Sequence, residues 1–123
     1  MKQLFLADLE NLTEEEIRTA LIEDYCATRE EVDKYDILIA YESVGSWGCD
    51  SSSFFLLRDR ETGKLYENHG SHCSCYGFED QFRPEETTIA YLKSNNFYFE
   101  TGGYDGESMT NQEKVKNYIK NEL

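Results

Sequence analysis

The sequence predicts an α+β fold, a small antiparallel β-sheet with flanking helices, in a single domain that spans residues 1–123. Two patterns lead to this prediction. Capping-box motifs precede apolar residues at helical spacing, and short runs of β-branched and aromatic residues lie between glycine-containing turns. Aromatic residues make up 14% of the chain, which is typical of a folded protein despite 30% charged residues.

The first third of the chain predicts two helices. Residues 3–12 fit either a short strand or the lead-in to a helix, and the pattern does not separate the two. Thr13 followed by three glutamates is a capping box, so we expect a helix over 13–27. A second capping box at Thr28 predicts a short helical turn that ends near Tyr35.

The middle of the chain predicts three strands. Residues 36–44 form an apolar run that indicates a strand buried on both faces. Residues 54–58 and 65–69 flank a turn with Gly63 in the left-handed position, which predicts an antiparallel hairpin. The loop over 45–52 leads into the first strand of this hairpin. Because the two strands are antiparallel, the loop should lie beside the residues that follow 69.

The last third predicts two further helices around a short strand. Pro84 and the two glutamates after it are typical of a first helical turn, and predict a helix to about residue 94. Ile89 and Leu92 should face inward from it. We expect a strand over 97–100 whose aromatic residues belong to the core rather than to a binding face, followed by a loop over 102–106. A capping box at Thr110 predicts a helix to about residue 121, with Val115, Tyr118 and Ile119 at helical spacing.

Metal-competent side chains are concentrated in one fifth of the chain. Three of the four cysteines and both histidines lie between residues 49 and 75. Zn²⁺ prefers four tetrahedral sulfur and nitrogen ligands, and a structural site takes all four from protein. The sequence therefore predicts a structural zinc site, with zinc as the cofactor, whose ligands are Cys49, His72, Cys73 and Cys75.

Alternatives to this ligand set remain open. His72 and Cys73 are adjacent, so both can bind one ion only if the backbone turns sharply. Otherwise His69 replaces His72, with Asp50 as a weaker oxygen ligand. Free buried thiols or a disulfide are the competing interpretations of the cysteines, and Cys26, which lies apart in a helical pattern, should simply be buried.

Charge indicates which partners the chain can take. The 25 acidic and 12 basic residues give a net charge of −13, and 11 of the acidic residues precede residue 37. Such a surface repels phosphate, so we expect no direct nucleic-acid binding and a basic protein partner instead. No apolar run reaches the ~20 residues of a membrane span, and the start is too soon acidic for a signal peptide, which predicts a cytoplasmic protein.

The sequence contains no recognisable reaction centre that would indicate an enzyme. The chain lacks the His-x-Glu and Pro-Cys-x-x-Cys pattern of zinc deaminases and the His-Glu-x-x-His pattern of zinc proteases. Glu79 and Asp80 follow the cysteine cluster and are either acids beside the metal or solvated loop residues. We therefore expect no catalysis, with a small zinc hydrolase or a regulatory protein of another partner as the alternatives.

The motif region resembles a known protein family. Residues 48–52, the segment Ser71-His72-Cys73-Ser74-Cys75-Tyr76-Gly77-Phe78-Glu79 and residues 84–88 resemble a family of small proteins encoded by phages and prophages. The resemblance extends over residues 45–92. This stretch is also similar to zinc-containing anti-CRISPR proteins that act on the RNA-guided Cas endonuclease of type II-A systems. Where Gly-Gln-Trp often follows the glutamate in that family, this chain has Asp80-Gln81-Phe82.

This resemblance implies a function that agrees with the charge. It implies an acidic protein of the bacterial host cytoplasm that occupies a basic surface of a type II-A CRISPR effector nuclease and stops target DNA from loading, without catalysis. Such an inhibitor needs a rigid negative face matched to lysine and arginine on the partner. The partner-binding acids expected from the sequence are Glu14, Glu15, Glu23, Asp24, Glu30, Glu31 and Asp33.

Overall fold

The computed structural model describes residues 2–44, 51–72, 77–101 and 106–123, except for the side chains of 106–109. These residues form a five-stranded sheet with the strands in sequence order. The strands are β1 (Leu4–Ala7), β2 (Tyr35–Ser43), β3 (Ser51–Asp59), β4 (Leu65–His72) and β5 (Glu85–Thr87). The helices are α1 (Glu14–Asp24), α2 (Arg29–Asp33), α3 (Ile89–Leu92) and α4 (Gly106–Glu122).

The α+β class is confirmed, but the sheet is mixed rather than antiparallel throughout. Neighbouring strands from β2 to β5 pair antiparallel, whereas β1 pairs parallel with β2. Parallel strands need a crossover connection, and α1 and α2 supply it between β1 and β2. The undecided segment over 3–12 therefore contains a strand, because its apolar residues complete one edge of the sheet.

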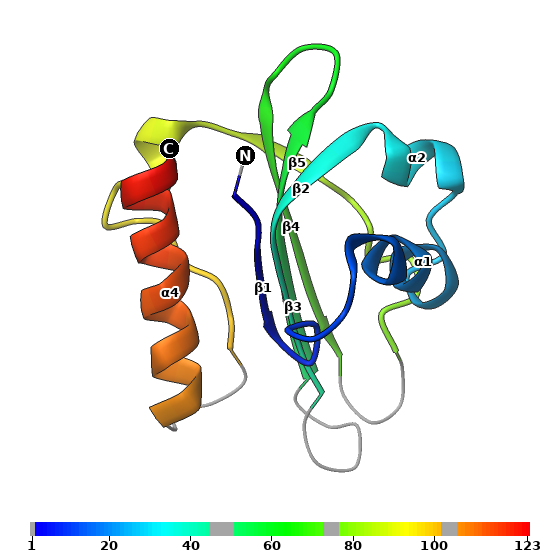
Figure 1. The fold of residues 1–123 in the computed structure, drawn as a ribbon, viewed down its shortest axis with the longest axis horizontal. Coiled ribbons are helices and arrows are strands. Elements are labelled where there is room, and N and C mark those ends of the chain that lie inside the picture. Colours follow the sequence, from blue (N-terminus) through cyan, green and yellow to red (C-terminus); the bar gives the residue numbers. More distant parts are fainter. Residues whose placement is uncertain (1, 45–50, 73–76, 102–105) are drawn as a thin grey trace.

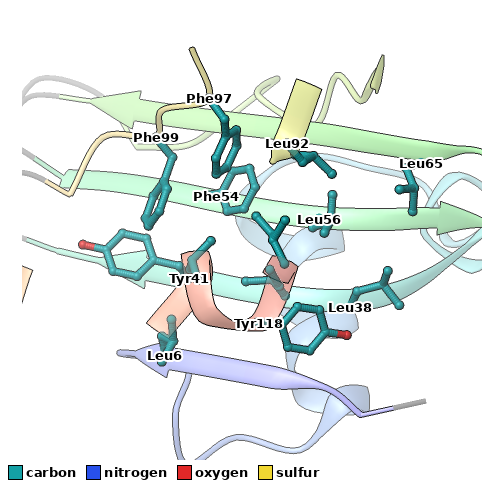
Figure 2. Close-up of a cluster of buried hydrophobic side chains, with 13 residues drawn as sticks. Leu6, Leu38, Tyr41, Phe54, Leu56, Leu65, Leu92, Phe97, Phe99 and Tyr118 are labelled. Carbon is teal, nitrogen blue, oxygen red and sulfur yellow. The ribbon is translucent and has the colours of Figure 1, made fainter. Parts of the chain in front are cut away.

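Helices cover both faces of the sheet. In Figure 1, α4 lies on one face, and α1 and α2 lie on the other. The core on the α4 side includes Leu38 and Phe54 from the central strands, together with Val115 and Ile119 of α4. Figure 2 shows Phe97 and Phe99 packing over Phe54 in this cluster. Burial on both faces explains why β2 and β3 are almost continuously apolar.

Local helix signals at the N-terminal end are confirmed. Thr13 accepts a hydrogen bond from the Glu16 backbone N–H, and the Glu16 carboxylate accepts one from the Thr13 N–H. Thr28 and Glu31 form the same reciprocal pair at the start of α2. The predicted hairpin turn is also confirmed, with Gly63 at a φ of 74°.

The expected helix over 84–94 is wrong in its first half. Residues 85–87 instead form β5, which pairs with residues 65–67 of β4. The helix that follows is only α3, capped by the Thr88 hydroxyl, which accepts from the Tyr91 N–H. Leu92 is buried as predicted, but the Ile89 side chain is 44% exposed.

Three smaller expectations also differ from the structure. No strand forms at 97–100, although Phe97 and Phe99 are buried core residues as expected, and Tyr98 is exposed to solvent. The last helix begins at residue 106, so Thr110 lies within it and is no cap. Cys26 is exposed at a φ of 60°, because α1 has already ended at residue 24. The expected loop over 102–106 lies almost wholly outside the described residues.

The helices in the described parts of the chain include none that is long and apolar enough to cross a bilayer.

A buried arginine joins α1 to α2 and β2. Arg18 is only 2% exposed, and its guanidinium donates to the carbonyl oxygens of Val32 and Tyr35 at 2.9 Å each. It also forms ion pairs with Glu14 at 3.3 Å and with Asp33 at 3.7 Å. A buried charge is tolerated only when its donors are matched in this way. Arg18 therefore fixes the position of α1 over the sheet.

We expect Arg18→Ala to lower the free energy of unfolding by about 3 kcal/mol, because it leaves buried carbonyl groups without donors. Urea denaturation measures this loss. Arg29→Ala is the matched control, since Arg29 forms its ion pairs with Glu15 and Asp33 at the surface and its loss should have little effect. Equal effects of the two substitutions would contradict the anchoring role of Arg18.

Candidate functional site

The end of the β3–β4 hairpin lies where the sequence placed the metal-competent residues. Ser51, the first residue of β3, pairs with His72, the last residue of β4. Directly opposed antiparallel residues have Cα atoms about 5 Å apart, so the chain segments before Ser51 and after His72 start side by side. The expected convergence of the two hairpin ends is therefore confirmed up to these two residues.

Most of the predicted zinc ligands cannot be placed. Cys49, Asp50, Cys73 and Cys75 lie outside the described residues. Among the residues that are described, no group of three or more histidine, cysteine, aspartate or glutamate side chains is arranged to hold a metal ion. The zinc site stays a prediction, with His72 as the only one of its four ligands that the structure places.

The structure separates the two histidines. His69 and His72 are three residues apart in β4, so their side chains lie on opposite faces of the sheet. The His69 ring packs against Phe54 in the α4-side core at 5.0 Å and contacts the Glu67 carboxylate at 2.8 Å. The His72 ring packs edge-on against Phe78 at 4.4 Å, on the α1 side. Only His72 stands at the hairpin end, which favours it over His69 as a ligand.

The segment after the cysteine cluster is fastened to the edge of β4. The Gln81 side chain bonds Ser71 twice, accepting from its N–H at 2.7 Å and donating to its carbonyl at 2.8 Å, as a neighbouring strand would. Asn68 donates to the Gln81 carbonyl and accepts from the Arg83 N–H. A Cβ at Gly70 would clash with the Ser53 hydroxyl and would lie 3.1 Å from Gln81 and from Phe78, which favours glycine at this position.

These contacts hold Phe78 against α1. The Phe78 ring stacks parallel to the Tyr25 ring at 4.8 Å, just after the end of α1. The Tyr25 hydroxyl donates a hydrogen bond to the Glu42 carboxylate at 2.7 Å. Residues from α1, β2 and the segment after β4 are therefore joined at one end of the sheet.

The carboxyl group of Glu42 has an unusual environment. Burial raises its pKa above the ordinary value of 4.5, and the nearby charges of Asp24 and Asp8 raise it further, whereas the Tyr25 hydroxyl opposes the shift. Burial also raises the pKa of Tyr25 far above its ordinary value, so Tyr25 stays a neutral donor. Glu42 is thus a partly buried acid surrounded mainly by negative charge.

Two adjoining pockets near Glu42 and α1 are lined largely by carboxylates. A pocket of about 350 Å³ on the solvent side of α1 is lined by Glu15, Glu16, Glu23 and Asp24, with the small residues Thr19 and Ala20 between them. A pocket of about 240 Å³ at the hairpin end is lined by Glu23, Asp24, Glu42, Glu79, His72 and Phe78. Because Glu23 and Asp24 line both, the two pockets form one continuous surface. We call its six carboxylates the acidic surface: Glu15, Glu16, Glu23, Asp24, Glu42 and Glu79.

The seven partner-binding acids predicted from the sequence divide into three groups. Glu14 and Asp33 bind Arg18, and Glu31 caps α2, so these three support the fold. Glu15 pairs with the exposed Arg29, which lowers the pKa of the Glu15 carboxyl. The three remaining predicted acids, Glu23, Asp24 and Glu30, are exposed and form no side-chain ion pair or hydrogen bond with any described residue.

Sequence reasoning missed Glu42 as part of this surface and left Glu79 undecided. The sequence shows Glu42 only as an acid near the end of the apolar run over 36–44. That Glu42 lies close to α1 depends on the parallel pairing of β1 and β2, which the sequence does not reveal. The Glu79 carboxylate accepts from the Gly77 N–H at 2.8 Å and lines the hairpin-end pocket. Asp80 does not line this pocket and has a φ of 62°, a conformation that favours glycine.

Comparison of the chain with models of protein families, with curated proteins and with solved structures found no match.

Replacing Glu42 should change how stability depends on pH. A carboxyl whose pKa is raised on folding favours the folded state when protonated, so this contribution is present below pH 4.5 and is lost as the pH rises through the folded-state pKa. Glu42→Gln removes the ionisation and keeps an acceptor for Tyr25. We expect the variant to gain stability relative to the wild type between pH 4.5 and 7, measured by urea denaturation across that range. A relative gain at low pH instead would contradict this assignment.

Proposed function

We propose that the chain is a non-catalytic inhibitor, whose acidic surface binds a basic, DNA-handling surface of a type II-A RNA-guided Cas endonuclease and blocks loading of target DNA. One observation carries the proposal: six carboxylates line two adjoining pockets, and among the described residues that line them His72 is the only side chain able to become cationic. A target-DNA channel is lined with lysine and arginine, to which such a surface is complementary. The resemblance of residues 45–92 supplies the identity of the nuclease.

The fold presents this surface as a rigid body. Arg18 joins α1 to α2 and β2 on the side that faces the sheet. The stacked rings of Tyr25 and Phe78 hold the segment after β4 against the end of α1. A preorganised surface loses less conformational entropy on binding, which favours high affinity without any chemical step. Glu23 and Asp24, which have no ion pair among the described residues, are available to the lysines and arginines of a partner.

The zinc ion has a structural role in this proposal. In the sequence, Cys49 lies two residues before Ser51, and Cys73 and Cys75 lie one and three residues after His72. These three cysteines would hold the ion together with His72. A site filled by four protein ligands supplies folding energy rather than a reactive water molecule. Zinc would thus fix the hairpin end, where Glu42 and Glu79 join the acidic surface to α1.

Charge reversal tests the binding surface. We expect Glu23→Lys with Asp24→Lys to abolish binding to the guide-loaded nuclease and to restore cleavage of target DNA, with the circular dichroism spectrum unchanged. Binding by the wild type should weaken steeply as salt rises. Glu113→Lys with Glu122→Lys is the matched control, because it makes the same charge change at exposed positions of α4. If the control pair abolished inhibition equally, overall charge rather than this surface would be responsible.

Elemental analysis tests the metal. The purified protein should contain about one zinc ion per chain, and Cys73→Ser with Cys75→Ser should remove both the zinc and several kcal/mol, on the order of 5, of stability. Cys26→Ser is the control, since Cys26 is exposed and lies at the end of α1, and this variant should keep its zinc. A well-folded wild-type protein without metal would exclude the structural zinc site. The charge-reversal experiment would then still test whether the acidic surface binds the nuclease.

A further inference from the structure

A third pocket lies on the opposite side of the sheet, where the C-terminal half of α4 meets the end of α3. Its volume is about 340 Å³, within the range of small-molecule sites. Three apolar residues line it, Leu92, Phe97 and Ile119, and three lysines line it as well, Lys93, Lys116 and Lys120.

The apolar lining belongs to the packed core. Leu92, Phe97 and Ile119 are between 2% and 6% exposed and are members of the α4-side cluster. Figure 2 shows Leu92 and Phe97 beside each other above Phe54, and Tyr91 packs edge-on against Phe97 at 6.2 Å. The walls are held by core packing, so the shape of this pocket does not depend on a bound ligand.

The lysines are the unusual feature. The chain has only 12 basic residues against 25 acidic ones, and three of the 12 line this single pocket. None of the three forms an ion pair with any described acid, although acids outnumber bases twofold. Lys116 and Lys120 lie four residues apart on one face of α4, and Lys93 faces them from the end of α3. Stabilisation of a helix C-terminus accounts for Lys120, in the last turn of α4, and for Lys93, the C-cap of α3, but not for Lys116.

We propose that this pocket binds a small organic anion with an apolar body, such as an aromatic or branched monocarboxylate. The carboxylate meets the lysine ammonium groups at the rim, and the apolar body covers Leu92, Phe97 and Ile119. Charge complementarity selects the anion, because ammonium groups that no described acid pairs with, beside an apolar floor, favour one negative charge over a neutral or strongly hydrated ligand. This site is separate from the acidic surface, and its occupation does not require the proposed inhibitory function.

Titration of the isotope-labelled full chain with naphthoate, followed by amide chemical shifts, tests the site. We expect saturable shifts concentrated in residues 92–97 and 116–120. The uncharged analogue naphthalenemethanol should bind about tenfold more weakly, and inorganic sulfate should not saturate the same amides. Equal binding of the charged and uncharged probes, or shifts spread over the acidic surface, would overturn the proposal.

Matched lysine variants locate the charge. Lys116→Ala with Lys120→Ala should weaken naphthoate binding about tenfold. Lys114→Ala, two residues before Lys116 on the same helix and outside the pocket lining, should change it less than about twofold. Exposed lysines are removed in both cases, so each variant should fold. If a glutamate-rich peptide shifted the same amides and naphthoate did not, the ligand would be an acidic protein segment and the small-anion proposal would be wrong.

Discussion

The guanidinium of Arg18 is the interaction on which the arrangement of the acidic layer depends. It binds the carbonyl groups of Val32 and Tyr35, which end α2 and begin β2, and it neutralises part of the charge of Glu14 and Asp33 beneath the exposed acids. The repulsion among the many carboxylates on α1 and α2 would otherwise push the two helices apart. One buried cation thus permits a dense negative surface to be rigid.

The acidic surface is assembled from segments that are far apart in the sequence. Glu23 and Asp24 come from α1, Glu42 from β2 and Glu79 from the segment fastened to β4 by Gln81. The stacking of Phe78 on Tyr25 brings the last of these to the end of α1. The opposite layer, built on α4, is chemically different, because three lysines that have no ion pair with any described acid line a partly apolar pocket there. The two sides of one small sheet therefore suit ligands of opposite charge.

Local signals predicted the parts of the fold that local physics determines. The capping boxes at Thr13 and Thr28 and the turn at Gly63 depend on residues three or four apart, and all three form as expected. The segment after Pro84 was predicted wrongly because β5 exists only through its pairing with residues 65–67, which no local pattern reveals. For the same reason the acids of α1 were evident from the sequence, whereas their junction with Glu42 required the tertiary structure. The predicted hairpin correctly brought His72 beside the start of β3, whereas the zinc site itself remains a prediction.

Hydrogen exchange of the complex between this protein and the guide-loaded nuclease tests the central claim most directly. The claim is that α1 and the hairpin end act together as one binding surface. It predicts that amides near residues 15–24 and 77–79 gain protection on binding, while those of α4 keep their free-state exchange rates. Protection confined to α4, or none on the α1 side of the sheet, would contradict it.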